Sequence, residues 1–180
     1  MTSRPRSAAA FDDISPGMLR RFTVDDLHKM VETGVVRADE PVQLLGGRIV
    51  VVPPPGDNER TVVDALMRRL TPALGGGYDV RGFRPLRLNA ENEPWPDLAV
   101  VRLDGGPESA RPRLVVEVSS GDALRFDRTI KAAAYAVTAV PEYWVIDLDR
   151  RCTEVQRSPD PASGTYRVLI TLDWEGHAFV

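Results

Sequence analysis

The stretch that decides the fold is Leu114-Val115-Val116-Glu117-Val118, an apolar run interrupted by a single carboxylate. A second apolar run, residues 98–103, begins directly after Asp97. Short apolar runs bounded by turn residues are typical of strands that are buried on both faces of a sheet. We therefore expect both runs to be central strands, with the carboxylates of Asp97 and Glu117 close to the core.

Helical segments surround these two strands. Apolar residues recur at helical spacing after Thr23, which is a good N-cap, and again in two later segments. In the last segment the predicted core-facing stripe is Phe126, Ile130, Ala133, Ala134 and Val137. The predicted helices are residues 24–31, 58–74 and 123–139.

Extended segments complete the pattern. The pair Gly46-Gly47 predicts a hairpin turn, because both glycines can adopt positive φ. Together with the helices, these segments predict an α/β fold, a mixed sheet flanked by helices. The further predicted strands are residues 42–45, 48–52, 78–89, 143–146, 153–156 and 166–172.

Length and composition describe an ordinary globular protein. The chain has 180 residues, of which 43% are apolar and 27% charged, and its net charge is −3. We expect a mobile leader over residues 1–17 and one domain over residues 18–180. Cys152 is the only cysteine, so no internal disulfide is expected, and no apolar run approaches the roughly 20 residues of a membrane span. A cytoplasmic protein without membrane insertion is the expectation.

The two carboxylates point to chemistry because a buried ionised carboxylate is costly unless it is paired or binds a metal. If the strands are neighbours, Asp97 and Glu117 could hold one hard cation, and Mg²⁺ typically takes one or two carboxylates plus water. Lys131 lies in the predicted helix 123–139, where its ammonium could reach inward. Taken alone, these residues favour a buried ion pair at Glu117 and a solvated lysine over a metal site.

The order of several motifs makes the chain resemble a known family. Its motifs run through most of the chain beyond the leader, and it is similar to the bacterial Uma family of restriction-endonuclease-like proteins, within the PD-(D/E)xK superfamily. The motifs that carry the resemblance are the segment 95–101, the segment 112–120, Asp127-Arg128 with Lys131 and Tyr135-Ala136, and the segment 140–147.

The resemblance implies a restriction-endonuclease-like fold and a role for each site residue. Asp97 and Glu117 would be metal ligands, joined by the backbone carbonyl of Val118. Lys131 would be the superfamily lysine supplied from the following helix, since Ser119 occupies its usual strand position. The implied activity is hydrolysis of DNA phosphodiester bonds with Mg²⁺, for which Mn²⁺ could substitute. A homodimer that cuts both strands is compatible with it.

The first hairpin departs from the family pattern. Gln43 and Arg48 stand where the family carries acidic residues, so Gln43 would be an accessory ligand without a negative charge. These departures motivate an alternative, in which the chain is a catalytically degenerate nuclease fold that binds nucleic acid or protein.

Two further expectations concern basic residues. One set of arginines could form either a solvated face or a groove that follows the phosphate backbone. Lys131 is expected at the edge of the site as a partly exposed cation. Lys131→Ala should therefore change stability by about 1 kcal/mol or less while cleavage falls by orders of magnitude. The arginines are Arg81, Arg84, Arg87, Arg125 and Arg128.

Overall fold

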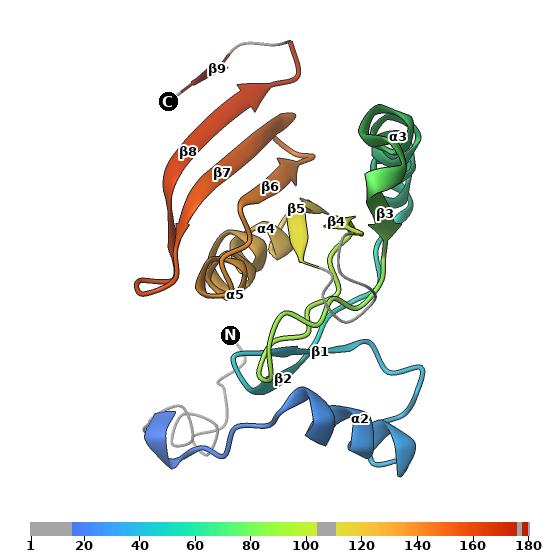
Figure 1. The fold of residues 1–180 in the computed structure, drawn as a ribbon, viewed down its shortest axis with the longest axis vertical. Helices are drawn as coiled ribbons and strands as arrows, with labels where there is room; N and C mark the ends of the chain where they lie inside the picture. The colour runs from blue at the N-terminus through green and yellow to red at the C-terminus, as the bar shows by residue number, and fades with distance from the viewer. Residues whose placement is uncertain (1–15, 104–110, 176–177, 180) are drawn as a thin grey trace, which may run out of the picture.

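The computed structural model describes residues 16–103, 111–175 and 178–179 (Figure 1). A seven-stranded mixed sheet with the order β3-β4-β5-β6-β7-β8-β9 forms its centre. The central strands are β4 (Leu98–Arg102), β5 (Pro112–Ser119) and β6 (Glu142–Asp147). The outer strands are β3 (Tyr78–Gly82), β7 (Cys152–Asp160), β8 (Thr165–Asp173) and β9 (Ala178–Phe179).

One parallel pair makes the sheet mixed. β5 and β6 run parallel, with Glu117 opposite Val145, and all other neighbours are antiparallel. A parallel pair needs a crossover connection, usually a helix. Here the crossover consists of α4 (Ala123–Phe126), the π-helical turn η4 (Asp127–Lys131) and α5 (Ala132–Val137).

Each face of the sheet buries an apolar layer under a helix. α3 (Asp57–Leu74) packs Val63 on Leu98, Val116 and other residues of one face. The crossover helix covers the opposite face, where Tyr135 packs with Val115 and other residues. β4 is buried over Leu98–Val101 and β5 over Val115–Ser119, which agrees with the predominantly apolar sequence of both strands.

A smaller layer lies beside the sheet and is visible at the bottom of Figure 1. It contains α2 (Val24–Glu32) and the hairpin of β1 (Val42–Leu45) and β2 (Arg48–Val51). Thr23 and Asp26 form a capping box at the start of α2. Val24, Leu27 and Leu44 fill the core of this layer, and a bridge from Leu44 to Glu93 joins it to the loop that enters β4.

Most predicted elements are confirmed, including the α/β class and the mixed sheet, whereas the strand predicted over residues 78–89 is shorter. β3 ends at Gly82, after which Phe83 adopts a positive φ of 51° and Pro85 lacks a backbone N–H for pairing. β9 was not predicted. The predicted leader lies largely outside the described residues. Within the described part of the chain, no helix has the length and apolar character needed to cross a membrane.

The helix predicted over residues 123–139 is present but differs in two ways. It contains the π turn η4, and its predicted core-facing stripe is buried only at Ala134. Ile130 is 50% exposed and Val137 is also exposed, whereas Asp127 and Lys131 are buried. The side of the helix that faces the sheet is therefore partly ionic, which the pattern of apolar residues could not indicate.

Candidate metal-dependent active site

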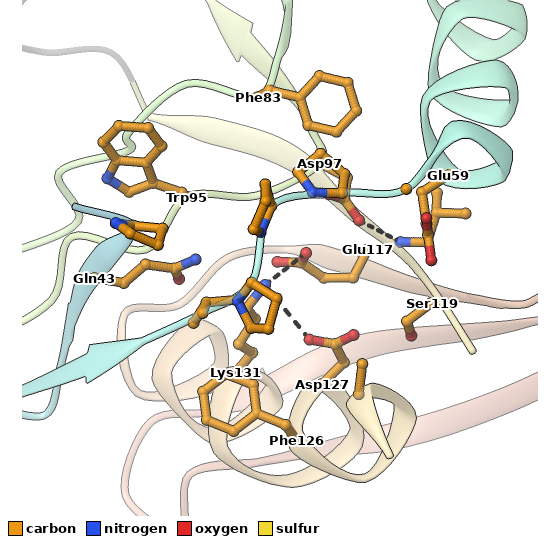
Figure 2. Close-up of a pocket in the computed structure, with 18 of the residues that line it drawn as sticks. Gln43, Glu59, Phe83, Trp95, Asp97, Glu117, Ser119, Phe126, Asp127 and Lys131 are labelled. Atoms are coloured by element: carbon orange, nitrogen blue, oxygen red, sulfur yellow. Dashed lines mark hydrogen bonds and ion pairs between the residues drawn. The ribbon is translucent and has the colours of Figure 1, made fainter. Parts of the chain in front are cut away.

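Asp97 and Glu117 meet on adjacent strands. β4 and β5 pair Leu98 with Val116, so the residue before Leu98 and the residue after Val116 lie side by side. The backbone N–H of Val118 donates a hydrogen bond of 2.7 Å to Oδ2 of Asp97. Both carboxylates line one cavity of about 450 Å³, which is shown in Figure 2. Both carboxylates thus lie in the same cavity, and their sharing of one metal ion stays a prediction.

Glu117 is held at both carboxylate oxygens. Lys131 Nζ donates to Oε2 at 2.8 Å, and the Tyr135 hydroxyl donates to Oε1 at 2.7 Å. Glu117 is only 1% exposed and Tyr135 is fully buried. The side chain of Glu117 is thus fixed in one orientation by two donors from the crossover helix.

The π turn positions the residues that face Glu117. Asp127, Lys131 and Tyr135 are spaced four residues apart, and all three are buried on the sheet side. Lys131 Nζ also lies 3.4 Å from Asp127 Oδ1. π turns inside helices are frequent at functional sites. Here the turn places one ammonium between two carboxylates, as Figure 2 shows.

The position of Lys131 agrees with the prediction, but its exposure does not. Its ammonium contacts Glu117 as expected, yet the residue is only 4% exposed. Although burial lowers the pKa of Lys131, the carboxylates of Glu117 and Asp127 raise it further, so the net shift is upward. The expectation of a partly exposed cation was therefore wrong: the lysine is buried against two carboxylates.

Burial raises the pKa of both carboxyls, Asp97 and Glu117, in the cavity. Burial raises the pKa of Glu117 to about 8 despite the opposing effect of Lys131. Burial likewise raises the pKa of Asp97 to about 6, although the Val118 N–H lowers it. Both carboxyls therefore hold their protons more tightly than exposed carboxyls do.

Two neutral oxygen atoms of the cavity are suitable as further donors. Gln43 Oε1 and Ser119 Oγ are buried and have no hydrogen-bond partner within the described structure. Buried polar atoms without partners are rare and call for an explanation such as a bound ion or water. β1 carries Gln43 to the cavity wall, whereas Arg48 is exposed and is not among the cavity-lining residues.

This donor set fits a hard cation. Within the described ranges, no three His, Cys, Asp or Glu side chains form a metal-binding group. Mg²⁺ commonly uses one or two carboxylates and keeps several waters, whereas structural zinc needs four protein ligands. Asp97 and Glu117 with the amide oxygen of Gln43 therefore match magnesium better than zinc. Val118 also lines the cavity, and the role of its carbonyl stays a prediction.

The five arginines considered from the sequence occupy different places. Arg128 is held by Asp147 at 2.7 Å and by both oxygens of Glu154, so it joins the helix to β6 and β7. Arg81 pairs with Asp79, and Arg87 pairs with Asp25. Arg84 and Arg125 are exposed. The structure does not bring the five arginines together at the cavity, since none is among its lining residues.

Some site residues were not assigned a role from the sequence. Asp127 and Tyr135 belong to the same family motif as Lys131. Their spacing of four residues on either side of Lys131 indicates that all three lie on one side of a helix. Glu59, in the first turn of α3, lines the cavity, and its charge contributes to the raised pKa of Asp97. Nothing local in the sequence marks Glu59, because its proximity depends on how α3 packs. Glu40 also lines the cavity, although its position in the sequence gives no reason to assign it to the site.

A family comparison agrees with this geometry. Residues 24–175 match the model of the Uma2 family, described as "Putative restriction endonuclease". The chain belongs to the Uma2 family. The matched range contains every residue of the carboxylate cavity described above, and the family description supports a nuclease. No curated protein matches the chain significantly.

A solved structure has a similar fold to this Uma2 chain. It is described as "a putative nuclease belonging to DUF820 from Anabaena variabilis ATCC 29413". The two share 15% sequence identity with a TM-score of 0.54, and the match covers 84% of each chain. At this identity the likeness concerns the fold, which is the restriction-endonuclease-like α/β fold.

Proposed function

We propose that this Uma2 protein is a Mg²⁺-dependent endonuclease that hydrolyses phosphodiester bonds of DNA. The observation that carries the proposal is the placement of Asp97 and Glu117 on adjacent strands, in one cavity, with Lys131 on Glu117. Such a cavity attracts a divalent cation, because its acidic side chains outnumber its basic ones. The acidic lining residues are Asp39, Glu40, Glu59, Asp97, Glu117 and Asp127, and the basic ones are Arg60 and Lys131.

Each residue has a defined part in this reaction. A bound Mg²⁺ would polarise the scissile phosphate and lower the pKa of water, and Asp97 and Glu117 would hold it, with Gln43 as accessory donor. Lys131 keeps its proton, because the neighbouring carboxylates raise its pKa, so it donates hydrogen bonds and does not act as a base. Its ammonium orients the attacking water and stabilises the charge that develops on phosphate oxygens.

Plasmid cleavage tests the proposal. Wild-type protein with Mg²⁺ or Mn²⁺ should convert supercoiled plasmid to nicked and linear forms, and EDTA should prevent this. Asp97→Asn and Glu117→Gln keep the side-chain size and remove the charge, so each should reduce cleavage at least about 100-fold. Arg48→Gln is the matched control outside the cavity and should cleave normally. Intact supercoiled plasmid together with intact single-stranded circular DNA, at high enzyme concentration with both metals, would refute the proposed activity.

One observation favours the second candidate, a degenerate nuclease fold that binds nucleic acid or protein. Both oxygens of Glu117 already accept hydrogen bonds, and Gln43 brings no charge to the site. On this alternative the protein would not need a metal. Calorimetry distinguishes the two candidates, because Mg²⁺ binding that Asp97→Ala abolishes argues against the degenerate fold.

A further inference from the structure

Aromatic rings share the cavity with the carboxylates. Trp95, Phe83 and Phe126 all line it, and Figure 2 shows them on different sides of Asp97 and Glu117. The segment 53–55, three consecutive prolines, adds a stiff apolar wall. The cavity therefore combines flat apolar surfaces with a charged floor, which is the composition of a site for a ligand with both an aromatic and an anionic part.

The backbone on both sides of Trp95 is restricted. It is 45% exposed, while Pro94 and Pro96 on either side are buried. The two prolines restrict the backbone on both sides of the tryptophan. The ring is thereby presented at the cavity only two residues before Asp97.

The backbone of Phe83 has an unusual conformation at the cavity wall. Its φ of 51° is in the left-handed region, which a bulky side chain occupies only at a cost of about 1 kcal/mol or more. The backbone N–H of Phe83 donates to the carbonyl of Asp97 at 3.0 Å, which ties its position to the site. The guanidinium of Arg60 lies 5.6 Å from the ring centre.

The charge of the cavity is unsuited to a double helix. Duplex DNA binds through several phosphate contacts from Lys and Arg. Of the two basic lining residues, Lys131 is buried on Glu117, and only Arg60 is exposed. The surrounding acidic residues would repel a second strand. A single strand presents fewer phosphates and can turn its bases toward the aromatic rings.

Resting on the proposed function, we propose that the cavity takes one unstacked nucleotide of single-stranded DNA. Its base stacks on Trp95 between the aromatic walls, its scissile phosphate faces Asp97 and Glu117, and a neighbouring phosphate meets Arg60. The volume of about 450 Å³ is in the range of small-ligand pockets. Stacking tolerates any base, because every base has a π face. A paired base cannot reach the rings without leaving its helix.

Fluorescence anisotropy with Ca²⁺ in place of Mg²⁺ tests this without requiring turnover. The probes are a labelled single-stranded oligonucleotide, its duplex, and a strand of equal length in which every nucleotide lacks its base. We expect the base-bearing strand to bind at least about tenfold more tightly than either other probe. Trp95→Ala should weaken binding of that strand about tenfold, in the range known for base–aromatic stacking, and leave the baseless strand unchanged.

Trp174→Ala is the matched control, since Trp174 is 46% exposed but does not line the cavity. It should bind all probes like the wild type, and melting curves should show both variants folded. Duplex binding as tight as single-strand binding, equal losses in both variants, or no binding to any probe would overturn the inference. Selective single-strand binding with neither plasmid nor single-stranded DNA cleaved would refute the proposed nuclease activity alone, and duplex cleavage without that selectivity would refute the inference alone.

Discussion

Glu117 is the residue whose environment explains the site. It lies in the middle of the most buried strands, where an unpaired carboxylate would be very costly. Two donors from one helix hold its oxygens, and a second buried acid, Asp127, shares the same lysine. The fold therefore depends on Lys131 in a way that a surface ion pair would not require.

Replacement of Lys131 should affect folding as well as activity. We expect Lys131→Ala to lower the free energy of unfolding by about 2–4 kcal/mol, because it leaves Glu117 and Asp127 buried without a cation. In Lys131→Ala/Glu117→Gln the loss should be smaller than the sum of the single losses by at least about 1 kcal/mol. Urea titrations of the four proteins measure both quantities. Additive losses would show that the two side chains do not depend on each other.

The pH dependence of stability follows from the raised pKa values. A carboxyl with a raised pKa binds its proton more tightly in the folded protein than in the unfolded chain. Without metal, these two carboxyls should contribute most to stability at acid pH, and their contribution should fall as the pH rises above the ordinary carboxyl range, levelling off above about 6 for Asp97 and about 8 for Glu117.

Melting temperatures at about pH 5 and about pH 8.5 measure this effect. Millimolar Mg²⁺ should raise the melting temperature more at the higher pH, where the carboxylates are free of protons. Glu117→Gln should show a weaker pH dependence than the wild type. A melting temperature that rises steadily toward pH 8.5 in both proteins would contradict these pKa values.

The existence of the crossover helix is predictable from the apolar pattern, but the side that it turns toward the sheet is not. The sequence predicts that a helix follows β5, and this is confirmed. The apolar stripe indicates the wrong side, because the helix turns Asp127, Lys131 and Tyr135 toward Glu117. Apolar periodicity assumes an apolar core, and this assumption fails where a site replaces part of the core.

Truncations on the two sides of this helix test its orientation. Leu124 is buried in the core, so Leu124→Ala should cost about 2–4 kcal/mol of stability. Ile130 is half exposed, so Ile130→Ala should cost less than about 1 kcal/mol. Chemical denaturation measures both values. Comparable losses, or a larger loss for Ile130→Ala, would support the stripe predicted from the sequence and contradict the structure.

Across the whole molecule, the sequence alone predicts the strands but does not predict which other segments pack beside them. The apolar runs predict β4 and β5, and the family resemblance predicts that Asp97, Glu117 and Lys131 converge. The approach of Glu59 and Gln43 depends on how α3 and the β1–β2 hairpin pack, which no local pattern contains. The arginines illustrate the same limit, since their spacing in sequence does not reveal which ones are engaged in ion pairs.

Arg128 and Arg125 should therefore behave differently. Arg128→Ala leaves the fully buried Asp147 without its guanidinium and should cost about 2 kcal/mol or more. Arg128→Lys should restore little, because one ammonium cannot reproduce the contacts to Asp147 and Glu154. Arg125→Ala, at an exposed position, should change stability by less than about 0.5 kcal/mol. Thermal unfolding of the three variants would contradict this account if Arg128→Ala melts like the wild type.

The central claim is that Asp97 and Glu117 together bind a divalent cation, and titration of the protein with Mg²⁺ in a calorimeter tests it most directly. At about pH 8, where both carboxyls can lose their protons, we expect one ion to bind per chain and protons to be released. Asp97→Asn and Glu117→Gln should each abolish binding, while Arg48→Gln should bind like the wild type. Absence of a binding signal in the wild type, or binding that survives both carboxylate substitutions, would contradict the claim.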